Sequence, residues 1–152
     1  MFEILHFRGA EEILKGKRMR NYRGKRIDNG KWVYGDLFHI GNHCFILTDT
    51  ASLWIDEDDA FIRGFIEVIP ETVGRSIGRK DRDDVEIYEG DKVEGGLDGC
   101  IYLVKWNHRV AAYGLVDDGV YSYPDVDAFE WEEIKVVGSI HGPEPIDERK
   151  EQ

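Results

Sequence analysis

The stretch that decides the fold is VEIYEGDKV, residues 85–93, together with YLVKW, residues 102–106. Gly90 and Asp91 form a dipeptide typical of turns, and this turn feeds a strand. YLVKW is rich in aromatic and branched residues, which predicts a neighbouring strand that pairs with the first. We therefore expect this part of the chain to be built from short strands and tight turns.

The same pattern continues toward the C-terminus. VAAYGLVDD, residues 110–118, and IKVVGSIHG, residues 134–142, are further short β-type runs separated by Gly and Asp. Their spacing is that of a small barrel or sandwich, and SH3-like barrels often open with such a turn and strand. The sequence predicts a mainly β fold, with minor helix and an SH3-like β-barrel over residues 71–145. Residues 146–152 have the composition of a frayed tail.

Residues 1–70 are predicted to form an N-terminal region of different character. AEEILKG, residues 10–16, predicts a short helix that ends at Gly16. Strands are expected over residues 31–40 and 43–49, because Gly41 and Asn42 between them tolerate the positive φ of a tight hairpin turn. The polar, Gly-containing residues 71–84 are expected to form a loop or a loose hairpin.

Charge is divided unevenly along the chain. The 152 residues carry a net charge of -11, yet residues 1–26 hold eight Lys or Arg against three Glu. An acidic body disfavours nonspecific binding of nucleic acid or anionic lipid. Cys44 and Cys100 are isolated, which is typical of a reduced cytosolic protein. No run reaches membrane-spanning length, so we expect a cytoplasmic protein without a membrane partner.

The basic segment, residues 18–26, is the first candidate site. Basic side chains around a tyrosine could neutralise phosphates while the ring stacks on a base. They could equally pair with carboxylates of the acidic body or of a neighbouring subunit, and we favour this second interpretation. The candidate contact residues are Arg18, Arg20, Tyr22, Arg23, Lys25 and Arg26.

A metal site, a cofactor and a catalytic centre are not expected. His39, His43 and Cys44 lie close in sequence, but adjacent residues of a strand point to opposite faces, so one donor turns away. The acidic residues 56–59 lack the glycine of a calcium loop, and Asp81, Asp83 and Asp84 fail the same test. No serine has the flanks of a nucleophile elbow and no phosphate-binding glycine loop is present. The predicted function class is therefore not an enzyme.

Tyr121 and Tyr123 are the second candidate site. SH3-like barrels hold peptides with surface aromatic residues beside acidic loops. Core packing is the competing interpretation for this aromatic cluster.

Several segments, taken in order, resemble one family. They are FRGAEE (7–12), YRGKRIDNGKWVYGDL (22–37), IPETVGRSIGRKDRDDVEIYEGDKV (69–93), YLVKW (102–106) and EEIKVVGSI (132–140). The chain from about Tyr22 to Gly142 resembles the YopX family of bacteriophage and prophage proteins. It departs from the family pattern at Arg79, where leucine or phenylalanine is usual, and at Asp83-Asp84, where an Asn-Gly turn is usual.

The resemblance implies an SH3-type C-terminal part, a tendency to associate and no catalytic residues. We expect a non-catalytic phage or prophage accessory protein in the bacterial host cytoplasm. It would act through contacts with itself and with an unknown protein partner, and subunits would join through strand edges or the N-terminal arm. The alternative is a nucleic-acid-binding accessory factor that uses residues 18–26.

Overall fold

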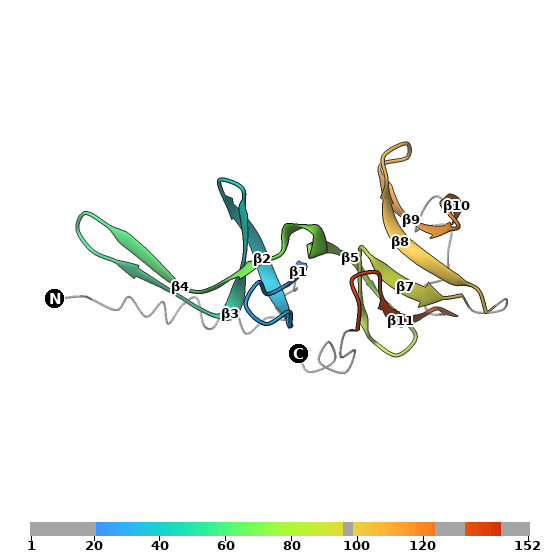
Figure 1. Ribbon diagram of the computed structural model, residues 1–152, viewed down its shortest axis with the longest axis horizontal. Helices are drawn as coiled ribbons and strands as arrows, with labels where there is room; N and C mark the ends of the chain where they lie inside the picture. Colours follow the sequence, from blue (N-terminus) through green and yellow to red (C-terminus); the bar gives the residue numbers. More distant parts are fainter. Residues whose placement is uncertain (1–20, 96–98, 124–132, 144–152) are drawn as a thin grey trace. The chain divides into compact units, whose positions relative to one another are not determined.

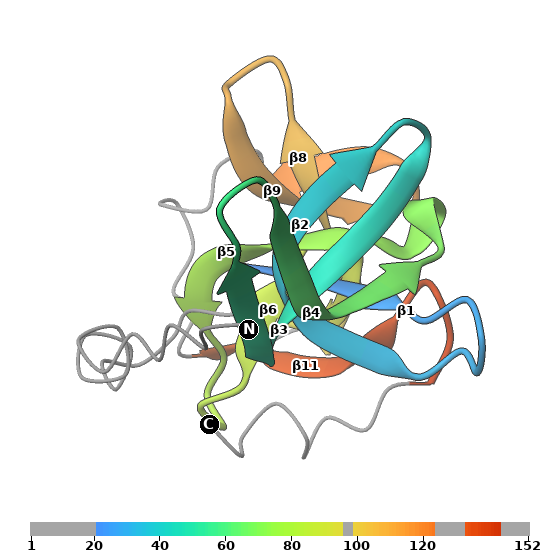
Figure 2. The same ribbon diagram turned by 90° about the vertical axis from the view of Figure 1, so that its left-hand side faces the viewer.

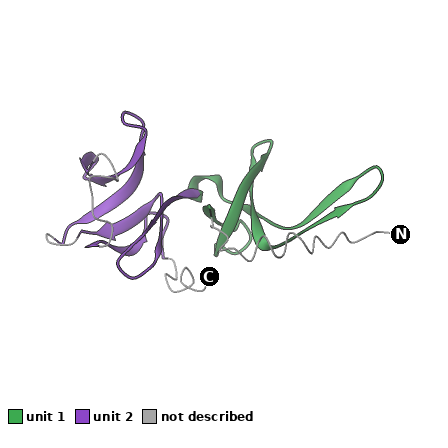
Figure 3. Cartoon of the chain, turned by 180° about the vertical axis from the view of Figure 1, so that it is seen from behind, with its two compact units in different colours: residues 1–73 green, residues 74–152 purple. Residues whose placement is uncertain are grey.

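The computed structural model describes residues 21–95, 99–123 and 133–143, and these are mainly β. They form eleven strands and one 3-10 turn, which confirms the predicted mainly β fold class. The predicted helix at 10–16, Arg18, Arg20 and the tail at 146–152 lie outside the described residues. The chain divides into two compact units, Met1–Val73 and Gly74–Gln152 (Figure 3).

Unit 1 is an antiparallel meander (Figure 1, Figure 2). Its strands lie in the order β4-β3-β2-β1, and the 3-10 turn η1 follows them. The predicted strands at 31–40 and 43–49 and the Gly41 turn are confirmed, although β3 continues beyond 49. The bounds are β1 Tyr22–Lys25, β2 Trp32–Ile40, β3 His43–Ile55, β4 Ala60–Val68 and η1 Pro70–Thr72.

The core of unit 1 lies on one face of this sheet. Cys44, Ile46 and Val68 are buried together, with Tyr22 and Leu37 among the half-buried residues around them. Gly24 lets β1 approach this core, because a Cβ there would lie 2.9 Å from a Val68 methyl carbon.

The first and last strands of unit 1 also meet through the backbone. Arg26 and Val68 form an antiparallel bridge, and the N–H of Ile69 donates to the carbonyl of Lys25 at 2.8 Å. The outer edge of β4 is therefore paired at its C-terminal end.

The distal half of the β3–β4 hairpin extends away from the rest of unit 1 (Figure 1). We call residues 48–64 the β arm. The pairing register shifts between Leu47 and Ser52, and the Thr48 hydroxyl donates to the Gly64 carbonyl at 2.8 Å. Gly64 has φ of 83°, and a Cβ there would lie 2.7 Å from the Ala51 Cα. Only glycine fits this bend without strain, so the arm leaves the sheet at a defined point.

Unit 2 consists of a hairpin and a five-stranded antiparallel sheet in the order β10-β9-β8-β7-β11. Residues 71–84, predicted as a loop or loose hairpin, include β5, which pairs loosely with β6. The end strands of the five-stranded sheet are not paired with each other in the described residues, so closure into an SH3-like barrel stays a prediction. The bounds are β5 Gly74–Lys80, β6 Glu86–Tyr88, β7 Asp91–Glu94, β8 Ile101–Asn107, β9 Ala112–Asp117, β10 Val120–Tyr123 and β11 Lys135–Ser139.

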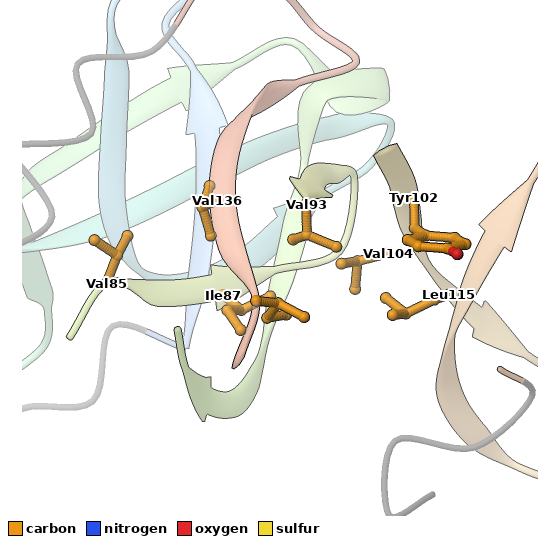
Figure 4. Packing of buried hydrophobic residues seen from close by; sticks show 8 residues of the cluster. Val85, Ile87, Val93, Tyr102, Val104, Leu115 and Val136 are labelled. Atoms are coloured by element: carbon orange, nitrogen blue, oxygen red, sulfur yellow. The ribbon is translucent and has the colours of Figure 1, made fainter. Parts of the chain in front are cut away.

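The core of unit 2 is formed by side chains that project from one face of its short strands (Figure 4). Branched residues dominate it, and burying each such side chain contributes about 1.5–3 kcal/mol. VEIYEGDKV (85–93) and YLVKW (102–106) together supply five members of this core. The buried members are Val85, Ile87, Val93, Tyr102, Val104, Leu115, Ile134 and Val136.

Candidate functional site

The described part of the basic segment is a strand of unit 1, not a free tail. β1 pairs with β2 so that Lys25 lies opposite Trp32 and Arg23 opposite Tyr34. The Arg23 guanidinium carbon is 4.7 Å from the Trp32 ring centroid, and the Lys25 ammonium is 5.4 Å from it. Both cations therefore contact the electron-rich face of one indole. Arg23 is buried, so a partner molecule would meet Lys25 but not the Arg23 guanidinium.

Tyr22 and Arg26 are also held by unit 1. Tyr22 packs against the core around Ile46. The Arg26 guanidinium donates two hydrogen bonds to Asp28, at 2.8 and 2.7 Å. These bonds raise the pKa of Arg26 and lower the pKa of Asp28. Arg18 and Arg20 lie outside the described residues, and contact of this segment with a partner or a nucleic acid stays a prediction.

Tyr121 and Tyr123 lie on β10 and have different surroundings. The Tyr121 hydroxyl donates to the Trp106 carbonyl at 2.7 Å, so its polar end is used within unit 2. Tyr123 packs edge-on against Tyr102, with ring centroids 5.7 Å apart, and it borders the core. Both rings are half-buried, and peptide binding by them stays a prediction.

The histidines near the β2–β3 turn point to opposite faces of the sheet. The Cys44 sulfur lies 3.3 Å from Nδ1 of His39, with which it is paired across the strands. His43 turns the other way and its Nδ1 lies 2.5 Å from a Glu67 carboxylate oxygen. No group of three or more potential metal ligands occurs in the part of the chain that the structure describes. Cys44 is instead packed into the unit 1 core, where the thiol is shielded from solutes.

The β arm carries an apolar surface that sequence reasoning missed. Leu53 lies opposite Ile62, and Trp54 lies opposite Phe61. Residues directly opposite share a face, so both faces of the arm are apolar. Leu53, Ile62 and Phe61 remain 43%, 46% and 51% exposed. The sequence does indicate strands in ASLWI (51–55) and in FIRGFI (61–66), but it does not predict that the two runs pair across the acidic residues 56–59 with both faces exposed.

Three phenylalanines add a second apolar surface on the solvent face of unit 1. Phe38 and Phe45 stack across β2 and β3 with ring centroids 5.2 Å apart. Phe65 meets both rings edge-on and stays 43% exposed. By strand alternation these rings lie on the face opposite Cys44 and Ile46. A monomeric soluble protein rarely leaves such large apolar groups together in water.

A known protein family matches this chain over most of its length. The family model described as YopX protein matches residues 21–145. The chain belongs to the YopX family. No curated protein matches it. The match to the YopX model includes both the β arm and the strands of unit 2.

Asp81, within the segment 69–93 that carries the YopX resemblance, holds parts of unit 2 together. The Asp81 carboxylate accepts the backbone N–H groups of Asp83 at 2.8 Å, Val85 at 2.9 Å and Val136 at 2.8 Å. It thereby joins the β5–β6 turn to β11, and Asp81 is buried. Asp84 adopts a φ of 64° where the family usually has an Asn-Gly turn. The tight turn therefore forms here with aspartate, a residue that tolerates the left-handed region.

Proposed function

We propose that this YopX protein is a non-catalytic accessory protein of phage or prophage origin that acts through protein–protein contacts and associates with itself. The observation that carries the proposal is the β arm, with apolar side chains exposed on both faces. A two-stranded ribbon with no covered face is only marginally stable in water. A protein partner that covers the arm would stabilise it.

The charges of the arm favour a protein partner over a nucleic acid. Its tip, residues 56–59, carries four acidic side chains, all exposed. Phosphate groups would be repelled by these carboxylates. The alternative function is nucleic-acid binding by residues 18–26. The described part of this segment gives it little support, because Arg23 is buried and Arg26 is bound to Asp28.

We further propose that unit 2 is the SH3-like part of the chain and that the protein works in the host cytoplasm. The short antiparallel strands β7 to β10 follow one another in the sheet, and β11 returns to pair with β7. This order supports the proposed relation to small barrels. In the described residues, no helix is long and apolar enough to span a bilayer.

Light scattering coupled to size-exclusion chromatography tests self-association. The chain has a mass of 17.6 kDa, so the proposal expects a multiple of that mass at micromolar concentration. The species should persist at high salt, because apolar contacts are not screened by ions. A monomer at about 100 µM, well above ordinary micromolar dissociation constants, would remove the proposal. Binding of DNA or RNA that weakens steeply with salt would favour the alternative.

A further inference from the structure

We propose that the β arm of one copy docks on the outer face of β7 and β8 in unit 2 of a second copy. This inference rests on the proposed self-association and names the two surfaces that form the contact.

The docking surface is the side of β7 and β8 that faces away from the unit 2 core. Tyr102 and Val104 point into the core, so Ile101, Leu103 and Lys105 point outward by strand alternation. Ile101 is 57% exposed and Lys105 is exposed, whereas Leu103 is half-buried beside the buried Val116 of β9, so the apolar surface open to a partner is centred on Ile101.

Lysines border the apolar residues of this face. On β7, Lys92 is exposed and lies directly opposite Leu103. Glu94 also lies on this face of β7, opposite Ile101 of β8 and Lys135 of β11, and the Lys135 ammonium is 3.9 Å from an Asp83 carboxylate oxygen. The result is an apolar strip of Ile101 and Leu103 bordered by two lysines, Lys92 and Lys105, and by one carboxylate, Glu94.

The β arm has the complementary pattern. Leu53 lies opposite Ile62, Ile55 shares their face, and the four acids of residues 56–59 follow at the tip. An apolar centre with charged groups at the rim is the usual anatomy of a protein interface. The apolar face would cover Ile101 and Leu103, while the tip carboxylates would meet Lys92 and Lys105.

A second copy is the occupant that these observations favour. The chain is strongly acidic overall, with a net charge of -11, so general repulsion opposes association between copies unless the contact joins opposite charges. The arm and the lysine-bordered face supply such a pair within one sequence. In a two-fold dimer each copy gives one arm and receives one, so two contacts form together. Two linked weak contacts bind more tightly than either contact alone.

Two charge-reversed variants test this arrangement. The first carries Lys92→Glu and Lys105→Glu, and the second carries Asp58→Lys and Asp59→Lys. Each should associate with itself at least about tenfold more weakly than wild type, because like charges then face each other across the contact. Mixed in equal amounts, the two should form a heterodimer of near wild-type affinity, since each arm then meets a face of opposite charge. Analytical ultracentrifugation at physiological salt measures both effects.

The matched control reverses two cations that lie on neither surface. Lys31 and Arg109 are both exposed, and the variant with Lys31→Glu and Arg109→Glu should associate as wild type does. A second test replaces apolar residues of the arm: Leu53→Ser with Ile62→Ser should weaken association, whereas Val120→Ser, at a position that is 69% exposed on β10, should not. Circular dichroism verifies that each variant is folded.

The outcomes separate this inference from the proposed function. A wild-type monomer contradicts self-association itself. A wild-type oligomer that the Lys92 and Lys105 reversals leave intact overturns docking on β7 and β8, while the proposed function stands. If the mixed variants do not associate, docking on β7 and β8 is also overturned. In that mixture every arm meets a face of opposite charge, so the proposed contact should form.

Discussion

Asp81 provides the sharpest test of how unit 2 is held together. In the Asp81→Ala variant, three backbone N–H groups lose their acceptor at once. The N–H groups of Val85 and Val136 are bonded in buried positions, whereas that of Asp83 is partly exposed and can turn to water. A buried donor without a partner costs about 1–3 kcal/mol. The two buried donors together predict a loss of about 2–6 kcal/mol in the free energy of unfolding.

Asp81→Asn should fall between wild type and alanine. The remaining carbonyl oxygen can accept the N–H groups of Asp83 and Val85, but the amide NH₂ would then face the Val136 N–H, donor against donor. A loss of about 1–3 kcal/mol follows from that one buried group. Asp83→Asn is the matched control, because it removes the same charge from an exposed position whose nearest cation, Lys135, is 3.9 Å away.

Urea denaturation followed by circular dichroism gives the three free energies of unfolding. Amide exchange at Val85 and Val136 reports the local effect and should accelerate only in the Asp81 variants. The reasoning is refuted if Asp81→Ala loses less than about 1 kcal/mol, the scale of a single exposed hydrogen bond. Equal losses in Asp81→Ala and Asp83→Asn would refute it as well.

Three further predictions concern unit 1. NMR titration should place the pKa of Asp28 below its ordinary value, mainly because Arg26 donates hydrogen bonds to it, and Arg26→Ala should raise it again. Since a lowered carboxylate pKa stabilises the folded state above the unfolded-state pKa, this contribution should be lost as the pH falls through the folded-state pKa of Asp28. Gly64→Ala should loosen the β arm at a cost of about 1–3 kcal/mol, because its φ is 83°; faster amide exchange confined to the arm would verify this, and unchanged exchange would contradict it. Trp32→Leu should destabilise unit 1 by about 2–4 kcal/mol, since Arg23 loses the ring it contacts; a loss under about 0.5 kcal/mol, typical of surface changes, would count against that contact.

Much of the fold followed from local patterns in the sequence. The strands on either side of Gly41 were predicted because a tight turn with positive φ leaves few alternatives. The strand after Gly90 was predicted for the same reason. The ends of the strands were harder to predict from the sequence. β3 continues to Ile55 because its distal half pairs with β4, and nothing in residues 50–55 alone requires that pairing.

The role of individual charged residues could not be read from the sequence. Arg23 was expected at a surface contact, yet the pairing of β1 with β2 places it against Trp32. Asp81 resembled its acidic neighbours in sequence, and only the approach of β11 gives it a third hydrogen bond. Both outcomes depend on residues distant in the chain, which periodicity and turn signals do not reveal.

The bridge between Arg26 and Val68 bears on how unit 1 is made in the cell. The ribosome delivers β1 well before its counterpart at the end of β4, and translation adds only about 5–20 residues per second. Until Ile69 has left the exit tunnel, the Lys25 carbonyl lacks its native donor. The nascent chain must therefore wait, incompletely folded, for seconds, and a chaperone that shields apolar strands would have that interval in which to act.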